Sequence, residues 1–257
     1  MKNILSTLAL GALITTAANA DFIRLEMGGG VWTQTPNGYA TQADGDGVFD
    51  LEGTYTSSEN ESNEAYAWIL LKHPLPIIPN VRLEYVSISD AGETTGKVAG
   101  VEIPGSSPTT MDVKEYDIIP YYNILDNTFW MTVDLGLDIK IVQSDVTMGA
   151  VKSTTAGVPD FEGYSTSDTT VIPLLYLRSR VEIPTTDIGI EADAKAITDG
   201  TNTMYDLRAK IDYTFDLDVI KPGIEIGYRY QKIKTDDGST QIDLDYSGIY
   251  AGAMLRF

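Results

Sequence analysis

The chain is 257 residues long and contains 37 acidic and 18 basic side chains, which gives a formal net charge of −19 at pH 7. So large a negative charge argues against a nucleic-acid partner, because phosphate binding needs clustered Lys and Arg. The absence of Cys excludes disulfides, thiolate nucleophiles and cysteine-ligated metal sites.

The N-terminus has the features of a secretory signal peptide. One positive charge precedes a mostly apolar segment, Ile4 to Ala18, which is too short to cross a bilayer core of about 30 Å comfortably. Ala18-Asn19-Ala20 then gives the small-x-small pattern that signal peptidase recognises, so cleavage is expected after Ala20. We therefore expect residues 1–20 to be removed and residues 21–257 to form one exported domain.

The remaining chain alternates between apolar and polar residues. Between Tyr205 and Phe215 the odd positions are apolar or aromatic, and the even positions are charged or Thr. A period of two is typical of β-strands, because charges at every second residue would surround a helix on all sides. No apolar run after the signal peptide reaches the ~20 residues of a transmembrane helix. The sequence predicts an all-β protein.

Eleven segments have strand character. They are residues 22–33, 46–56, 64–72, 80–89, 110–124, 128–142, 169–183, 187–197, 203–216, 223–234 and 242–257. Bacterial single-chain barrels have even numbers of strands, so one of these assignments is expected to be wrong. The pattern is weakest in 34–64, where Gly, Asn, Ser and Asp interrupt it. We favour twelve strands, with ten as the alternative.

The length of the alternating segments favours a membrane barrel over a soluble one. Strands of soluble proteins usually run about 5–6 residues, whereas several segments here alternate over 11 to 13. Ten steps of about 3.3 Å, tilted by about 40°, span roughly 25 Å of bilayer. This predicts an antiparallel transmembrane β-barrel with its apolar faces outward. A soluble secreted β-protein is the alternative.

The end of the chain indicates an orientation. The last predicted strand has an uncharged face and ends on Phe257, which resembles the signal that the outer-membrane assembly machinery of Gram-negative bacteria recognises. With this end in the periplasm, the tight turns at 125–127 and 184–187 are predicted to be periplasmic. Residues 89–110 and 143–168 are then expected to form two long external loops.

Three segments carry a resemblance to a known family. The first, Phe22–Trp32, contains three consecutive glycines, and the second, His73–Leu83, contains three prolines. The third is Ile118–Tyr122, followed by Asp134–Leu137. Together they resemble a family of functionally uncharacterised outer-membrane β-barrel proteins that is named for a Gly-Gly pair in the first strand. The resemblance implies this fold and location for the whole mature chain, and it implies no catalytic residue or substrate.

No catalytic site is indicated. Outer-membrane barrel enzymes resemble one another in placing a His beside Ser, Asp or Glu near the external rim, where a general base can reach the substrate. The single histidine, His73, lies instead in a Pro-rich turn predicted on the periplasmic side. We interpret His73 as a turn residue and expect a protein that is not an enzyme.

No metal or cofactor site is predicted. Asp44-Gly45-Asp46-Gly47 resembles part of a calcium loop, but the bidentate Glu of that motif does not follow at the required spacing. Asp236-Asp237-Gly238 indicates a hairpin turn. We interpret both as turns, and weak binding of divalent cations by acidic outer loops stays open.

The polar faces of the strands predict which residues line the lumen. The candidates are Asp134, Asp138, Arg178, Arg180, Glu182, Glu191, Asp193, Asp206, Arg208, Lys210, Asp212, Glu225 and Arg229, with Glu26 and Glu84 on earlier strands. Opposite charges such as Asp206 and Arg208 are close enough to satisfy each other and fill a narrow barrel. If water passes instead, the acidic excess predicts a preference for cations.

Two functions follow from these alternatives. We favour a small channel or facilitator with an acidic, cation-preferring lumen, and the alternative is a closed structural or adhesive barrel that acts through its external loops. The expected partners are outer-membrane lipid, lipopolysaccharide and the barrel assembly machinery. The sequence does not identify a solute.

Overall fold

A computed structural model describes residues 23–42, 51–58, 60–75, 77–98, 100–217, 220–236, 238 and 240–257. The signal peptide predicted at 1–20 and the calcium-loop-like segment 44–47 lie outside the described residues. Within the described ranges, no helix has the length and apolar character needed to cross a membrane.

The described chain folds as one antiparallel sheet of eleven strands. They are β1 (Arg24–Gln42), β2 (Leu51–Ser57), β3 (Ser62–Lys72), β4 (Asn80–Val98), β5 (Val101–Thr128), β6 (Met131–Met148), β7 (Tyr164–Ile183), β8 (Ile188–Thr198), β9 (Asn202–Thr214), β10 (Lys221–Asp236) and β11 (Thr240–Arg256). Each predicted strand overlaps one of these, so the all-β class is confirmed.

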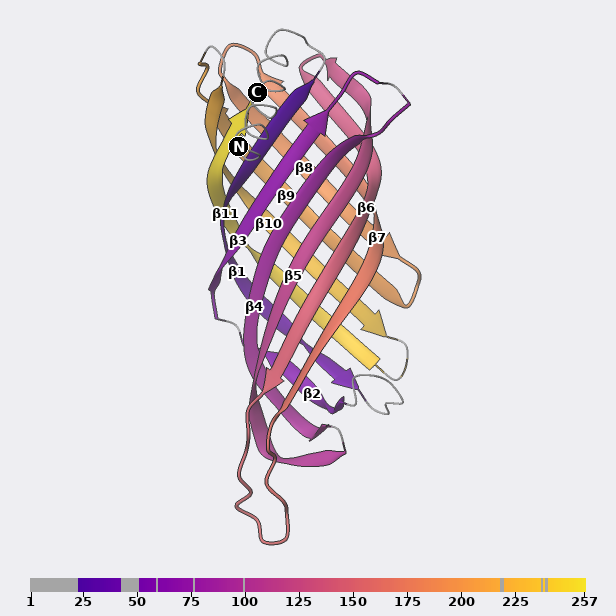
Figure 1. The fold of residues 1–257 in the computed structure, drawn as a ribbon, viewed down its shortest axis with the longest axis vertical. Coiled ribbons are helices and arrows are strands. Elements are labelled where there is room, and N and C mark those ends of the chain that lie inside the picture. Colours follow the sequence, from indigo (N-terminus) through magenta and orange to yellow (C-terminus); the bar gives the residue numbers. More distant parts are fainter. Residues whose placement is uncertain are drawn as a thin grey trace, which may run out of the picture.

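The sheet closes on itself because the last strand pairs with the first (Figure 1). β11 runs antiparallel to β1 along the length of both strands. The backbone N–H of Phe257 extends this seam by donating to the Leu25 carbonyl at 2.9 Å. The predicted assembly signal, Phe257, therefore lies at the closure of the barrel.

Two short strands, β2 and β3, share one place in the wall. β2 pairs with β1 at Tyr39–Thr41 and with β4 at Gly92–Val98. β3 pairs with the opposite halves of the same two strands. The described residues thus form a closed barrel of ten strands, with β2 as an additional short strand in line with β3. Ten was the alternative number, and twelve is not found among the described residues, because β2 and β3 together occupy the place of one strand between β1 and β4.

Both ends of the described chain lie at the same end of the barrel, which we call the terminal end (Figure 1). The predicted turn at 184–187 is confirmed there. The predicted turn at 125–127 is wrong, because β5 continues to Thr128 and the chain reverses at Phe129-Trp130. Both of these aromatic residues have positive φ, 52° and 63°, as a tight type I′ hairpin turn requires.

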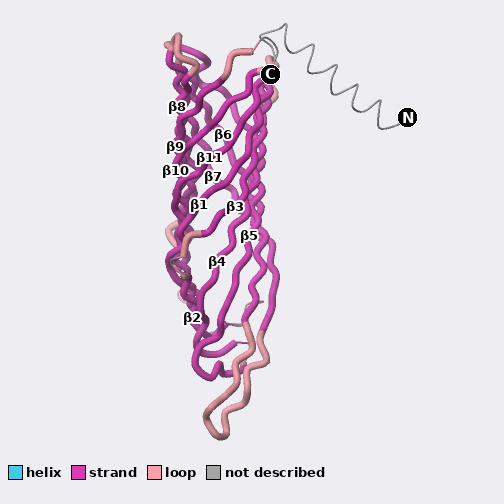
Figure 2. The backbone as a smooth tube through the Cα atoms, turned by 90° about the vertical axis from the view of Figure 1, so that its left-hand side faces the viewer, coloured by secondary structure: helices cyan, strands magenta, loops and turns pink. Residues whose placement is uncertain are grey.

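At the opposite end, which we call the far end, several strands continue well beyond the rest of the barrel (Figure 2). The predicted loop 89–110 is wrong, because β4 runs to Val98 and β5 begins at Val101. The predicted loop 143–168 shrinks to 149–163. In these extensions both faces of the strands are largely polar, so the period-two pattern fades although the backbone ladder continues.

The outward side chains near the terminal end form an apolar belt. Exposed aliphatic residues in it include Leu83, Leu135, Leu137, Leu175, Leu177, Ile190, Leu207, Ile211, Ile224, Ile226 and Ile249. Tilted or edge-on aromatic pairs border the belt, with two pairs toward the far end and one at the terminal end. The pairs are Tyr85 with Tyr116, Tyr205 with Tyr230, and Tyr213 with Phe215. Such a belt between aromatic girdles is typical of a membrane barrel.

Two of the three consecutive glycines in β1 are closely approached by neighbouring groups. On β1 the inward positions are even-numbered, so Gly28 and Gly30 face the interior. A Cβ at Gly28 would lie 2.7 Å from the Trp68 indole, and one at Gly30 would lie 2.1 Å from the Ala251 carbonyl oxygen. Glycine is therefore needed here because a neighbouring ring and backbone approach the strand closely.

Candidate functional site: the charged interior of the barrel

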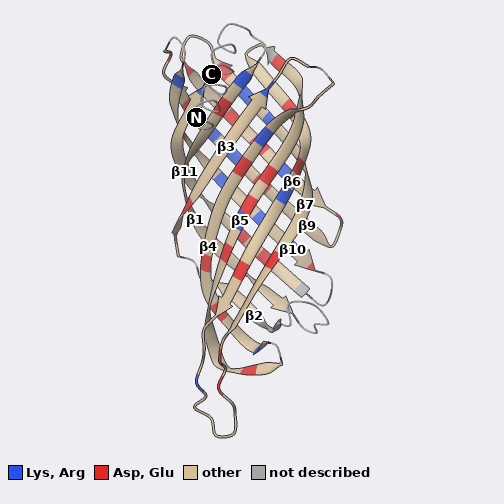
Figure 3. Ribbon diagram, viewed as in Figure 1, with Lys and Arg blue, Asp and Glu red and all other residues tan. Residues whose placement is uncertain are grey.

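Alternation places charged side chains inside the barrel and apolar ones outside. On β9, Asp206 and Asp212 are buried, whereas Leu207 and Ile211 are 43% and 53% exposed. Figure 3 shows acidic and basic residues distributed along the strands of the same region. This orientation is the reverse of a soluble barrel, in which the apolar face would be buried.

Most of the residues predicted to line the lumen are buried. They are Asp134, Asp138, Arg178, Arg180, Glu191, Asp193, Asp206, Lys210, Asp212, Glu225 and Arg229, as are Glu26 and Glu84. The Arg208 side chain is 10% exposed. Glu182 differs, because its side chain is 46% exposed and pairs with Arg24 and Arg180 near the terminal end. The interior therefore contains an interlocked set of charges, which forms two groups.

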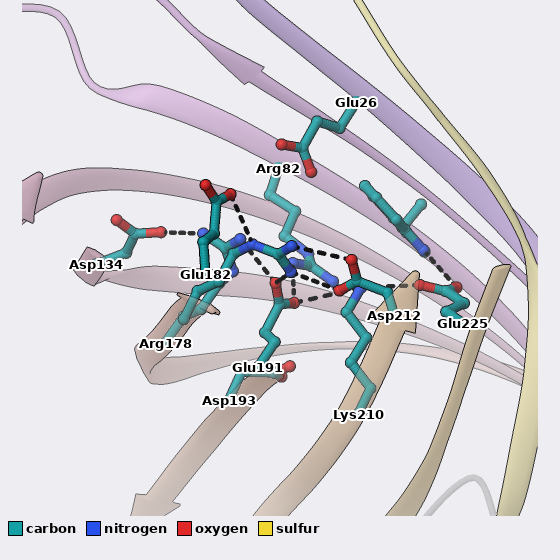
Figure 4. A network of polar contacts seen from close by, with 12 residues as sticks. Glu26, Arg82, Asp134, Arg178, Glu182, Glu191, Asp193, Lys210, Asp212 and Glu225 are labelled. Atoms are coloured by element: carbon teal, nitrogen blue, oxygen red, sulfur yellow. Dashed lines mark hydrogen bonds and ion pairs between the residues drawn. The ribbon is translucent and has the colours of Figure 1, made fainter. Parts of the chain in front are cut away.

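The first group, toward the terminal end, is centred on Glu191 (Figure 4). Its carboxylate lies 2.7 Å from Arg178 Nη2, 3.2 Å from Arg82 Nη1 and 3.4 Å from Arg180 Nη1. Lys210 Nζ lies 3.6 Å away. Four cations from three strands thus converge on one carboxylate, and we call this the Glu191 cluster.

Further carboxylates satisfy the remaining charge of those cations. Arg178 Nη1 donates to Asp134 at 2.5 Å, and Arg180 donates to both Asp212 oxygens at 2.6 and 3.0 Å. Lys210 Nζ donates to Glu225 at 2.8 Å. Because buried charges are costly unless paired and hydrogen-bonded, these reciprocal contacts fix the side chains across the bore.

The second group, toward the far end, is centred on two lysines that are fully buried, Lys140 and Lys195. Lys140 Nζ lies 2.9 Å from Glu115 and 2.8 Å from Asp117. Lys195 pairs with Glu84 and Asp117, and lies 3.6 Å from Asp206. We call this the lysine cluster. Its contacts join strands β4, β5, β6, β8 and β9 across the interior.

The predicted lumen lining lacked five residues of these two clusters: Arg82, Glu115, Asp117, Lys140 and Lys195. The signal for the lysines was present, because each stands two positions after a predicted inward Asp and therefore on the same face. Glu115 and Asp117 share their inward face with buried apolar residues, so that face did not look polar.

An aromatic side chain, Trp68, packs against the Glu191 cluster. The guanidinium carbon of Arg82 lies 5.2 Å from the centroid of its ring, and Lys210 Nζ lies 4.6 Å from the same centroid. Its indole N–H donates to Glu225 at 3.0 Å. Cations over the ring and an acceptor at its edge use both the negative face and the polar tip of indole.

Above the lysine cluster, toward the far end, the bore is filled by apolar side chains. The buried members are Trp32, Tyr55, Val86, Ile88, Val113, Leu244, Tyr246 and Tyr250. We call this set the apolar cap. Interior packing of this kind has few voids as large as a water molecule. The bore is therefore filled by ion pairs at one level and by hydrocarbon at the next.

A buried carboxylate, Asp90, lies next to the apolar cap. It lies five residues beyond Tyr85 of the belt border, on the far-end extension. The Tyr55 hydroxyl donates to Asp90 Oδ2 at 3.0 Å. Burial raises the pKa of Asp90 to about 6 from its ordinary value of 3.8, because desolvation disfavours the charged form.

The single histidine is engaged in its own turn. The Leu75 N–H donates to His73 Nδ1 at 3.2 Å, which leaves the proton on Nε2, 3.1 Å from the Pro79 carbonyl oxygen. The His73 N–H in turn donates to Asn80 Oδ1 at 2.9 Å. Both ring nitrogens therefore hold the Pro-rich segment together. Among the described residues, no group of three His, Asp or Glu side chains has the arrangement of a metal site.

Comparisons with protein-family models and with curated proteins gave no match. One similar solved structure is the outer membrane protease OmpT from Escherichia coli, with 10% identity, 93% of this chain and 97% of that chain covered, and a TM-score of 0.54. The translocator domain of the autotransporter NalP from Neisseria meningitidis is 13% identical, with 100% of this chain and 96% of that chain covered and a TM-score of 0.41. The P. putida toluene transporter TodX is 11% identical, with 95% of this chain and 91% of that chain covered and a TM-score of 0.33.

The likeness to OmpT extends to the fold alone at this identity. This chain therefore has the fold of an outer-membrane β-barrel. The resemblance to the Gly-Gly family stays a prediction, as does the expectation that the protein is not an enzyme.

Proposed function

We propose that this chain is an outer-membrane β-barrel of a Gram-negative bacterium whose interior is closed to ions. The apolar belt between its aromatic borders supports the location, since it presents to lipid what a soluble protein would bury. The barrel then inserts with the terminal end in the periplasm and the far end outside the cell, with membrane lipid, lipopolysaccharide and the assembly machinery as partners.

The observation that carries the proposal is the direct ion pairing across the bore. Lys195 of β8 pairs with Glu84 of β4, and Glu191 of β8 pairs with Arg82 of β4, on the opposite side of the barrel. An open channel would need these charges to be hydrated by a continuous file of water. Here the charges are paired with one another instead of with water. The apolar cap lies between them and the far end.

The protein then acts through the part that extends outside the membrane, as a structural or adhesive barrel. The extensions of β4 to β7 and the connection 149–163 present a mainly polar surface there. A non-enzymatic role is part of the proposal, and the engagement of both His73 ring nitrogens in a turn supports it.

Planar-bilayer recording of the refolded mature protein tests the closed interior. We expect no discrete conductance steps from protein whose heat-modifiable migration on a gel shows that it is folded, while a general porin inserted in the same bilayer conducts. The matched variant Lys140→Ala with Lys195→Ala empties the lysine cluster, and we expect it to raise the frequency of ion-conducting events.

A cation-preferring channel is the second candidate, and one observation favours it. Thirteen buried carboxylates stand against seven buried Lys and Arg in the described residues, and an acidic lining prefers cations. Discrete, cation-selective steps from the unmodified protein would overturn the closed-barrel proposal and support this channel.

A further inference from the structure

The far-end part of β7 has one side without a neighbouring strand. On the first side, β6 pairs with β7 from Tyr164 to Val181. On the second side, β8 pairs with β7 only from Leu175 to Ile183, because the β8–β9 hairpin turns back well short of the far end (Figure 1). In the described part of the chain, no strand therefore pairs with residues 164–172 on the side away from β6. We call residues 164–172 the β7 edge.

The β7 edge lies on the water side of the apolar belt. At the far-end border of the belt, Tyr116 is joined through one residue of β6 to Val171. Tyr205, at the same border, is joined through one residue of β8 to Leu175. The border therefore crosses β7 near Pro173, which has no N–H to offer a further strand. The residues before Pro173 form an edge roughly 30 Å long at about 3.3 Å per residue.

The β7 edge lacks most of the features that keep a strand edge from pairing. Over this fully described stretch, its register with β6 has no bulge, and the sequence contains neither Lys nor Pro. Thr, Val and Ile, which favour extended backbone, are frequent in it although little of it is buried. Its exposed residues are Ser165, Ser167, Asp168, Thr169, Thr170 and Val171. Such an edge is a template for one more strand.

The charge of the β7 edge indicates which strand it accepts. Asp168 is its one charged side chain, and its carboxylate accepts from the Thr170 hydroxyl at 2.8 Å, a neutral partner that leaves the charge in place. Residues 143–172 contain four acidic residues and one Lys. A second copy of this chain would bring another Asp168 to the same edge, and like charges directly opposite each other are destabilising. A basic residue opposite Asp168 is favourable instead.

We propose that the β7 edge binds an extended, positively charged segment of a partner polypeptide, which pairs with residues 164–172 as an additional strand. Backbone hydrogen bonds supply the affinity, and a Lys or Arg opposite Asp168 sets the register. An antiparallel segment would lie in line with β8, as β2 lies in line with β3 elsewhere in the wall. The inference deepens the adhesive role proposed above and rests on its placing of the far end outside the cell.

A synthetic strand tests the site. The probe is a dye-labelled, capped peptide of alternating Thr and Val with one central Lys, as long as the β7 edge, added to the refolded protein in detergent micelles. We expect saturable binding by fluorescence anisotropy, at least about threefold tighter than that of the same peptide with Glu in place of Lys, as a cross-strand ion pair predicts. Equal binding of the two peptides, or no saturable binding of the Lys peptide, would overturn the proposal.

A peptide copied from residues 164–172 stands for a second copy of this chain. We expect it to bind more weakly than the Lys peptide, and tighter binding would assign the edge to self-association and overturn the proposal. Because the peptides are added to refolded protein, their failure to bind would leave the closed interior, which bilayer recording tests, unaffected.

Charge reversal tests the contact with Asp168. Asp168 is exposed, so Asp168→Lys should keep the fold and exchange the preference, with the Glu peptide now binding more tightly than the Lys peptide. Asp112→Lys is the matched control, since Asp112 is also exposed but lies on β5 where strands pair on both sides. We expect this control to keep the preference for the Lys peptide. An unchanged preference in Asp168→Lys would overturn the pairing of a basic residue with Asp168.

Cross-linking locates the peptide, because the chain has no Cys of its own. Thr169→Cys should form a disulfide with a Lys peptide that has a Cys next to its Lys. Thr110→Cys is the matched control, since Thr110 is equally exposed but lies between two paired strands, β4 and β6. Equal cross-linking of the two variants would overturn binding at the β7 edge.

Methylation of the peptide backbone tests the ladder. Two Lys peptides are methylated on the backbone nitrogens of alternate residues, one on each of the two possible sets. In a paired strand, one set faces β7 and the other faces water. We expect one of the two peptides to bind at least about tenfold more weakly than the other, because its donors to β7 are lost. Equal affinities would overturn binding as an additional strand.

Discussion

The Arg229 guanidinium lies over the Trp32 indole ring, with its central carbon 4.7 Å from the ring centroid. On its other side the same guanidinium donates to both oxygens of Asp206, at 2.9 and 2.7 Å. Arg229 is thus the contact between the lysine cluster and the apolar cap. An arginine fits this position because its flat cation stacks on a ring while its edge binds a carboxylate in bidentate fashion.

Replacing Lys195 by Met should destabilise the barrel strongly. The change leaves Glu84 and Asp117 buried with less compensating charge, which typically costs about 3–5 kcal/mol. Urea unfolding of the protein in lipid vesicles would measure this. Lys232→Met is the matched control, because Lys232 pairs with Asp243 at a partly exposed position on the outside, where loss costs about 1 kcal/mol or less. Similar losses for the two variants would contradict the packed lysine cluster.

Adding one methyl group at Gly28 should cost more than adding it at Gly29. The new Cβ at Gly28 would lie 2.7 Å from the Trp68 ring, a rigid neighbour, and overpacking of this kind costs about 1–3 kcal/mol. At Gly29 the nearest atom is the Tyr66 carbonyl oxygen at 3.0 Å. The two alanine variants are compared by urea unfolding, and equal midpoints would argue against the close packing of Trp68 on β1.

The free energy of unfolding should depend on pH through Asp90. Its pKa in the folded protein is about 6, above the ordinary value of 3.8, so the folded state holds the proton more tightly. The contribution of Asp90 to stability is therefore greatest below about pH 4 and falls as the pH rises to about 6, by up to about 3 kcal/mol at 1.36 kcal/mol per pKa unit. Asp90→Asn should remove this component from the pH profile measured by urea unfolding.

The variant Tyr55→Phe tests in which direction the pKa of Asp90 changes when its hydrogen-bond donor is removed. The Tyr55 hydroxyl donates to the carboxylate and lowers the pKa of Asp90, opposing the effect of burial. Removing the hydroxyl should raise that pKa further, so the loss of stability should extend to higher pH. A shift of the profile toward lower pH, or no difference between Asp90→Asn and the unmodified protein, would contradict the buried position of Asp90.

The orientation in the membrane is tested with single cysteines in the cysteine-free background. Thr155 lies in the connection 149–163 at the far end, and Thr186 lies in the turn 184–187 at the terminal end. An impermeant thiol reagent added to intact cells should label a cysteine at position 155 and should leave one at 186 unlabelled until the cells are opened. The opposite pattern would reverse the orientation.

The strands of the belt were predictable from sequence because every second side chain faces outward and must be apolar. On β9, Leu207 and Ile211 face outward and Asp206 and Asp212 face inward, as the alternation indicates. Outside the belt the constraint disappears, since both faces meet water. This is why β4 beyond Ser89 looked like a loop, although it continues as a strand to Val98.

The pairing of charges across the interior was not predictable. Neighbours on one strand, such as Asp206 and Arg208, suggested local compensation, but Arg208 pairs with Asp193 on β8 and Glu84 on β4. Which strands face each other depends on the number of strands and on their stagger, and a single sequence encodes neither directly. The apolar cap was missed for a related reason, because Trp32 and Tyr250 lie on strands whose two faces are both mainly uncharged.

The seam between β1 and β11 also determines when folding can finish. It brings Glu26 opposite Arg256, so nearly the whole chain must be in place before the two strands meet. Contacts so distant in sequence form late, because the entropy of closing the loop is lost before any pairing compensates it. Until then β1 presents an unpaired edge that can join a strand of another chain. A protein built this way depends on being held apart from its neighbours until its final residues arrive.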